Sequence, residues 1–106
     1  MTVLERTIID RVKASVAKRL SLCRVILFGS RARGDAEADS DLDVLVILNE
    51  PVTREAEDYV SDCAWEAGFE YGIVVAPVTV SRHDWEEGLL SSSLLAIAIE
   101  KEGVPV

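Results

Sequence analysis

The chain has 106 residues, of which 49% are hydrophobic and 28% are charged, and its formal net charge is −8 at pH 7. This composition excludes wholesale disorder and predicts one globular domain over residues 1–106 with a single hydrophobic core. The negative charge argues against direct nucleic-acid binding, because most of the surface would repel a phosphate backbone. No stretch reaches the roughly 20 apolar residues of a membrane helix. Residues 1–12 are too charged for a signal peptide, which predicts a cytoplasmic location.

The first half of the chain predicts one helix followed by two strands. Residues 3–20 carry apolar side chains at every fourth position, as an amphipathic helix does, and Thr2 is suited to cap its N-terminus. Residues 23–29 (CRVILFG) are rich in β-branched and aromatic types and end at glycine, which indicates a short strand. Residues 41–48 (DLDVLVIL) end in a continuous apolar run, which favours a central strand covered on both faces. The apolar stripe of the helix consists of Leu4, Ile8, Val12, Val16 and Leu20.

The second half predicts a third strand between further helices. A second helix follows the Asn-Glu-Pro break and is expected to end at Gly68. Residues 72–81 (GIVVAPVTVS) indicate a strand, and Pro77 within it favours the edge of a sheet or a bulge. Residues 81–88 suit a capped helical turn, and residues 92–103 suit a short last helix. The alternation of strands and helices predicts an α/β or α+β fold, with a small sheet and helices packed on it.

Residues 29–43 (GSRARGDAEADSDLD) contain the residues with a chemical signature. Their two glycines have the G-x-x-x-x-G spacing of a phosphate loop, but Asp35 stands where that loop needs lysine, so this interpretation fails. A plainer interpretation is a solvated polar turn between two strands. Asp41 and Asp43 are different, because their i, i+2 spacing on a strand places both carboxylates on one face, about 6–7 Å apart. Such a pair is costly unless a cation lies between its members, and hard oxygen ligands suit Mg²⁺.

Gly29 and Ser30 suggest a phosphate-binding site beside such a cation. A strand that ends in Gly-Ser and enters a short helix offers backbone N–H groups and a hydroxyl to a phosphate. Gly29 has no Cβ to obstruct the approach of the phosphate. One strand end would thus hold phosphate while the next strand supplies metal ligands. We therefore interpret this region as a site of phosphoryl or nucleotidyl transfer, in which metal neutralises phosphate charge and aligns the attacking oxygen.

This motif resembles a known signature. Gly29-Ser30, followed after ten residues by Asp41-x-Asp43, resembles the DNA polymerase beta-like nucleotidyltransferase superfamily, and the fuller string GSRARG with SDLD looks like its minimal nucleotidyltransferase (MNT) branch. Over nearly the whole chain, the resemblance implies the polymerase beta-like nucleotidyltransferase fold, built on a small mixed sheet. It implies that Gly29 and Ser30 hold the triphosphate of ATP or another NTP. It also implies that Asp41 and Asp43 are the catalytic ligands of Mg²⁺ or Mn²⁺.

Three further residues lie near the motif and are compared with the superfamily. Arg33 would either contact phosphate or support the acidic loop, whereas Arg31 is expected to be a solvated surface residue. The superfamily usually adds a third carboxylate on a later strand, but residues 72–81 contain none. Glu70 is the nearest acid and the candidate third metal ligand, although a solvent-facing position is favoured for it. Activity therefore depends on an acid outside the motif.

The resemblance also implies a function and a partner. The expected enzyme is a nucleotidyltransferase that moves an NMP, specifically AMP from ATP, to an acceptor hydroxyl and releases pyrophosphate. MNT proteins of this size commonly pair with helical HEPN proteins in toxin–antitoxin modules, and some add AMP to a tyrosine of the toxin. The resemblance thus implies a HEPN-type partner and an antitoxin role. One alternative is a catalytically degenerate binding module that neutralises its partner by contact only. Another is a stand-alone enzyme acting on a small molecule, which the short chain disfavours.

Overall fold

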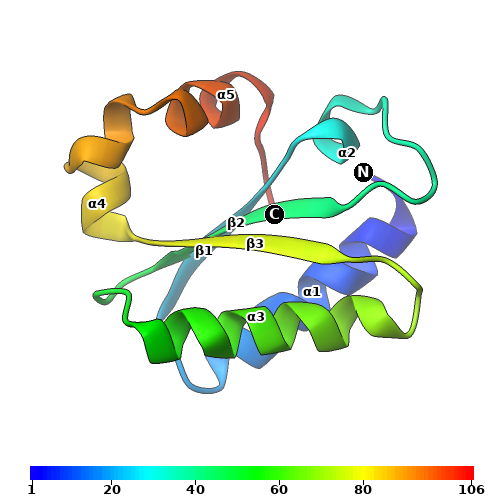
Figure 1. Cartoon of the computed structure of the whole chain (residues 1–106), viewed down its shortest axis with the longest axis horizontal. Helices are drawn as coiled ribbons and strands as arrows, with labels where there is room; N and C mark the ends of the chain where they lie inside the picture. The colour runs from blue at the N-terminus through cyan, green and yellow to red at the C-terminus, as the bar shows by residue number, and fades with distance from the viewer.

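The computed structural model describes residues 1–106, apart from the side chains of Leu89 and Leu90. Four strands form one sheet in the order β3-β2-β1-β4, with helices on both of its faces (Figure 1). The mixed sheet and its helices confirm the predicted fold class. The elements follow one another as α1 (Val3–Ala17), β1 (Leu22–Phe28), α2 (Ser30–Arg33), β2 (Leu42–Leu48), α3 (Arg54–Phe69), β3 (Val75–Ser81), α4 (Arg82–Glu86), a 3-10 turn η1 (Leu89–Ser92), α5 (Leu94–Glu102) and β4 (Val104–Pro105).

Strand β2 is central, as its continuous apolar run predicts. It pairs antiparallel with β1 on one side and parallel with β3 on the other. The register places Asp43 opposite Phe28, at the end of β1, and opposite Ala76, near the start of β3. The beginning of β2 therefore lies beside the residue at which β1 turns into α2.

The two faces of the sheet are covered to different extents. Helices α1 and α3 lie against what we call the covered face, where Leu42, Val44 and Val46 of β2 join a large cluster of buried side chains (Figure 1). On the opposite face, which we call the open face, Leu45 and Ile47 join a smaller cluster with side chains from α4 and α5. Because side chains alternate along a strand, Asp43 lies on the open face together with Leu45.

The start of α1 agrees with the prediction at Thr2 and differs from it at Leu4 and Glu5. The Thr2 hydroxyl accepts from the Glu5 backbone, and the Glu5 carboxylate accepts from the Thr2 backbone, which forms a complete capping box. Glu5 is buried, however, while Leu4 of the expected apolar stripe is 38% exposed. The prediction that Leu4 belongs to the buried stripe is therefore wrong, because the capping box turns the Glu5 side chain inward.

Helix α3 starts after its cap Thr53 and continues through Gly68 to Phe69. The prediction that Gly68 ends the helix is wrong. A Cβ on Gly68 would lie 2.0 Å from the carbonyl oxygen of Ile73, so the glycine allows the chain leading to β3 to pack directly against the helix. None of the helices described in this structure is both long and apolar enough to span a membrane.

The edge strands of the sheet each contain a proline. Strand β3 forms one edge, as Pro77 predicts, and β4 forms the other. Beyond the predicted elements, Val104 and Pro105 pair antiparallel with Leu27 and Ile26 of β1. Residues from the end of the chain thus complete the sheet beside the strand that leads to Gly29.

Candidate functional site

Gly29 and Asp43 are in direct contact. Gly29 follows β1 with φ +76°, a backbone conformation that disfavours residues with a side chain. A Cβ built on it would lie only 2.3 Å from Oδ2 of Asp43. The sequence suggested that this glycine leaves room for a phosphate. The structure shows that it leaves room for the Asp43 carboxylate, and the phosphate contact stays a prediction.

Asp41 and Asp43 are close enough to influence one another. Burial raises the pKa of Asp43 above its ordinary value, the negative charge of Asp41 raises it further, and Arg33 lowers it in part. The charged form of Asp43 is therefore less favourable in the protein alone than in an unperturbed aspartate, and a cation would relieve both causes. Two carboxylates with hard oxygen atoms fit Mg²⁺ or Mn²⁺, so Asp41 and Asp43 would hold such an ion.

Arg33 lies in α2 and contacts two carboxylates. Its Nε atom is 3.2 Å from Oδ2 of Asp35, and its Nη1 atom is 3.1 Å from Oε2 of Glu102 at the end of α5. These partners raise the pKa of the Arg33 guanidinium. Because exposed ion pairs contribute little to stability, the guanidinium can leave them for a phosphate with little loss. Both expected roles of Arg33, phosphate contact and support of the acidic loop, stay open.

The side chain of Arg31 is almost entirely covered, and the expectation that it is a solvated surface residue is wrong. Only 8% of its side chain is exposed, and Nη1 lies 3.1 Å from Oε2 of Glu5. Its Nε atom donates to the carbonyl oxygen of Ser40 at 2.9 Å, and Nη2 donates to that of Ala38 at 3.2 Å. Arg31 thus supports the loop that leads into Asp41, which is one of the two roles considered for Arg33.

Glu5 is the residue that the sequence reasoning missed. Burial by itself raises the pKa of Glu5, but hydrogen bonds with Thr2 and Arg31, together with the Arg31 charge, lower it more. The net pKa of Glu5 is therefore lower than usual. The spacing Thr2-x-x-Glu5 is a visible capping-box signal. The bond from Glu5 to Arg31 joins residues 26 positions apart, and no local pattern reports it.

Glu70 is not brought to the acidic pair. It caps the end of α3, and its Oε2 atom lies 2.7 Å from Nη1 of Arg11 on α1. Its side chain is 65% exposed, which agrees with the solvent-facing position favoured for it. Among the side chains that the structure describes, no three His, Cys, Asp or Glu residues gather as a metal site. On the open face of β3, Ala76 and Val78 lie beside Asp43 and Leu45, where a third carboxylate would be expected.

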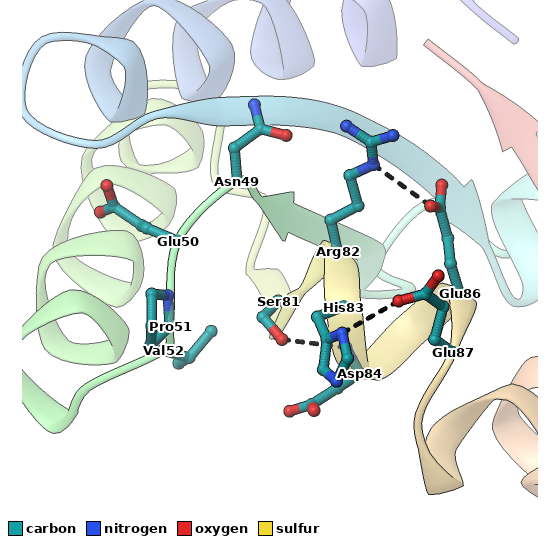
Figure 2. A pocket seen from close by; sticks show the side chains of 10 residues that line it. All are labelled: Asn49, Glu50, Pro51, Val52, Ser81, Arg82, His83, Asp84, Glu86 and Glu87. Atoms are coloured by element: carbon teal, nitrogen blue, oxygen red, sulfur yellow. Dashed lines mark hydrogen bonds and ion pairs between the residues drawn. The ribbon is translucent and has the colours of Figure 1, made fainter.

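A cavity of about 900 Å³ lies at the opposite end of β2 (Figure 2). It opens between the segment after β2 and helix α4, roughly 20 Å from Asp43 at about 3.3 Å per strand residue. Arg82 is bonded there to Glu86, and the exposed His83 to Glu87. Phosphate would be repelled, because the walls also contain further acids. The carboxylates of this cavity are Glu50, Asp84, Glu86 and Glu87.

Comparisons with known proteins identify the family of this chain. The profile of the nucleotidyltransferase domain family matches residues 9–104. A Methanocaldococcus jannaschii protein with the attributed name protein adenylyltransferase MJ0141 is 38% identical over 61 residues, which are 58% of this chain and 62% of that relative. The chain thus spans less than two thirds of that relative.

Two solved structures resemble this one. A structure described as a minimal nucleotidyltransferase is 30% identical, with a TM-score of 0.60, over 96% of this chain and 95% of its own. A structure of a tri-AMPylated Shewanella oneidensis HEPN toxin in complex with an MNT antitoxin matches 97% of this chain and 68% of its own, with a TM-score of 0.57. At 21% identity, that second likeness concerns the fold alone. The chain belongs to the nucleotidyltransferase domain family, and it resembles a minimal nucleotidyltransferase over nearly its whole length.

Proposed function

We propose that residues 1–106 act as one metal-dependent nucleotidyltransferase domain that moves AMP from ATP to a hydroxyl group on a partner protein. The observation that carries the proposal is the packing of Asp43 against Gly29, with Asp41 near enough for the two carboxylates to repel each other. The attributed name of the archaeal relative, a protein adenylyltransferase, supports the type of reaction. ATP as the substrate favours a cytoplasmic setting.

The proposed roles follow from the positions of the residues. Asp41 and Asp43 would hold Mg²⁺ or Mn²⁺, which when bound neutralises phosphate charge and aligns the attacking oxygen. Ser30 begins α2 next to Gly29 and would position the triphosphate, with Arg33 available to contact it. The acceptor oxygen forms a bond to the α-phosphorus of ATP while the bond from that phosphorus to the pyrophosphate oxygen breaks. The hydroxyl proton passes to solvent, and pyrophosphate leaves.

The proposed acceptor is a tyrosine of a helical HEPN-type partner, with this chain as the antitoxin of a toxin–antitoxin module. The AMPylated HEPN toxin that accompanies an MNT antitoxin in the similar solved structure supports this choice. A protein partner would also supply the acceptor site, because Val78, near Asp43 on the open face, is 36% exposed and leaves this part of the sheet accessible.

A labelling experiment tests this function. The chain is incubated with Mg²⁺, ATP labelled at the α-phosphate and the protein encoded by the neighbouring gene. We expect label on the partner with the wild-type chain and with Asp39→Asn, which removes an exposed acid of the same loop. Asp43→Asn should abolish labelling. Absence of transfer by the wild-type chain, together with full antitoxicity of Asp43→Asn, would contradict the proposal.

One observation favours a second candidate, a binding module that neutralises its partner by contact only. The open-face positions of β3 next to the acidic pair hold Ala76 and Val78 instead of a carboxylate. Calorimetry with ATP and Mg²⁺ separates the two functions. Binding that requires Mg²⁺ and is lost in Asp41→Ala supports the enzyme, whereas no binding by the wild-type chain supports the contact-only module.

A further inference from the structure

We propose that Arg31, paired with Glu5, is a positioning residue that holds the segment before Asp41 in place beside Asp43. The inference rests on the proposed function in one respect, namely that Asp41 and Asp43 act together on a metal ion. Neither Arg31 nor Glu5 has an assigned role in that reaction. Their importance follows from which atoms they contact and from how the charges are distributed around them.

The first step of the argument concerns the loop between α2 and β2. Residues 35–41 have no helical or strand structure, and they contain Asp41 at their end. Arg31 donates to two backbone carbonyl groups of this loop, those of Ala38 and Ser40. The Ser40 carbonyl belongs to the peptide bond that enters Asp41. The guanidinium therefore fixes the path of the chain up to Asp41 and does not depend on the loop side chains.

The second step concerns the repulsion between the two carboxylates. The Asp43 side chain packs against Gly29, and its backbone is fixed by the pairing of β2 with β1. Asp41 precedes the first residue of β2, so a loop without support would swing it away from the negative charge of Asp43. The bonds from Arg31 oppose this movement before any cation arrives. They therefore preorganise the pair for a metal ion.

The third step explains why Glu5 accompanies Arg31. A guanidinium with 8% of its side chain exposed requires a partner, and the Glu5 carboxylate, 5% exposed, supplies it at 3.1 Å. Because Glu5 balances this charge, Arg31 does not take the place of a metal ion at the acidic pair. Glu5 is itself fixed by the capping box with Thr2, so the position of Asp41 is tied to the start of α1.

The experiment compares three variants of the full chain. Arg31→Lys keeps the positive charge but has its donors on a single nitrogen, which does not reproduce the spread of the three guanidinium nitrogens over Glu5 and the two carbonyl groups. The double variant Glu5→Gln with Arg31→Gln leaves no unpaired buried charge. It therefore tests the positioning role of Arg31 even if neutralising one member of the pair alone unfolds the chain. Arg82→Gln is the matched control, since it breaks an arginine–glutamate pair on α4, away from the loop.

Two measurements are made well below the melting temperature of each variant: amide hydrogen exchange of residues 36–41, and calorimetric binding of ATP in the presence of Mn²⁺. We expect faster exchange in this loop, and binding weaker by about tenfold or more, in Arg31→Lys and in the double variant. Arg82→Gln should match the wild-type chain in both. A merely structural role would lower the melting temperature without changing either measurement.

The outcomes separate this inference from the proposed function. The inference would be overturned if amide hydrogen exchange of the loop in Arg31→Lys and in the double variant equalled that in Arg82→Gln. It would also be overturned if Arg31→Lys behaved like the wild-type chain in both measurements. If the wild-type chain itself binds no ATP with Mn²⁺, the proposed function fails. The amide hydrogen exchange of residues 36–41 alone then decides whether Arg31 holds this loop in place.

Discussion

The covered face and the open face of the sheet share the strand β2 and differ in what they contribute. On the covered face, Leu42, Val44 and Val46 are fully buried against α1 and α3. On the open face, Asp43 lies on the same strand with a pKa that burial and Asp41 raise. Apolar burial on one side therefore stabilises a sheet whose other side holds two carboxylates that repel each other. The covered face is therefore apolar along the whole of β2, whereas the open face changes from carboxylates at the start of the strand to the buried Leu45 and Ile47 further along. Four predictions can test this contrast.

The largest effect should come from the covered face. Leu42→Ala removes a fully buried side chain, and we expect it to lower the free energy of unfolding by about 2–5 kcal/mol. Val78→Ala on the open face, where Val78 is 36% exposed, should change it by less than about 0.5 kcal/mol. Urea denaturation of both variants measures the difference. Equal losses would contradict the contrast between the buried start of β2 on the covered face and the exposed position of Val78 on the open face.

The next effect concerns Glu5, which links α1 of the covered face to α2. Glu5→Gln should lower stability at pH 7 by about 3 kcal/mol, because it breaks a buried ion pair. Since the pKa of Glu5 is lowered on folding, its stabilising contribution is present above its unfolded pKa and is lost as pH falls through the folded value. Wild type and variant should therefore begin to converge in stability as pH falls below the ordinary glutamate pKa of 4.5, and converge fully only below the lowered pKa of the folded protein. A difference that is constant from pH 7 to pH 3 would contradict this.

Gly29 offers an intermediate effect with a matched control. Gly29→Ala and Gly34→Ala both place a side chain at positive φ, so each should lower stability by about 1–3 kcal/mol. A Cβ at Gly29 meets Asp43, whereas one at Gly34 meets nothing within 4 Å. Only Gly29→Ala should therefore weaken Mn²⁺-dependent ATP binding, as measured by calorimetry. Equal loss of binding in both variants would show that the contact with Asp43 is unimportant.

The smallest effect should be a gain in stability. Asp43→Asn removes a carboxylate whose pKa is raised on folding, so it should stabilise the metal-free protein at pH 7 by up to about 1 kcal/mol. Because the unfavourable form is the charged one, the gain should be present above the folded pKa and disappear as pH falls below the ordinary value near 3.8. Thermal unfolding against pH measures it, with Asp39→Asn as the control that should show no gain.

Local patterns predicted most of the fold. The Thr2 cap, the central place of β2 and the edge position of Pro77 all follow from residues near one another in the sequence. The contact between Gly29 and Asp43 followed less directly, since the motif placed them together but suggested phosphate as the neighbour of the glycine. The errors at Leu4 and Gly68 have different causes. At Leu4 the capping box turns the neighbouring Glu5 inward, and at Gly68 the backbone of Ile73 folds back onto the helix.

The positions of Arg31 and Glu70 depend on tertiary structure. Arg31 has the same type and nearly the same sequence position as Arg33, yet one is buried against Glu5 and the other is exposed between Asp35 and Glu102. No periodicity distinguishes them, because α2 has only four residues. Glu70 is similar, since its pairing with Arg11 results from how α3 packs on α1.

The prolines at the two sheet edges have a consequence for association. Pro77 in β3 and Pro105 in β4 each remove an amide donor from the strand that borders solvent. A foreign strand would meet an interrupted ladder at either border, which disfavours growth of the sheet by further chains. The two prolines thereby guard the sheet against edge-to-edge pairing with copies of this chain.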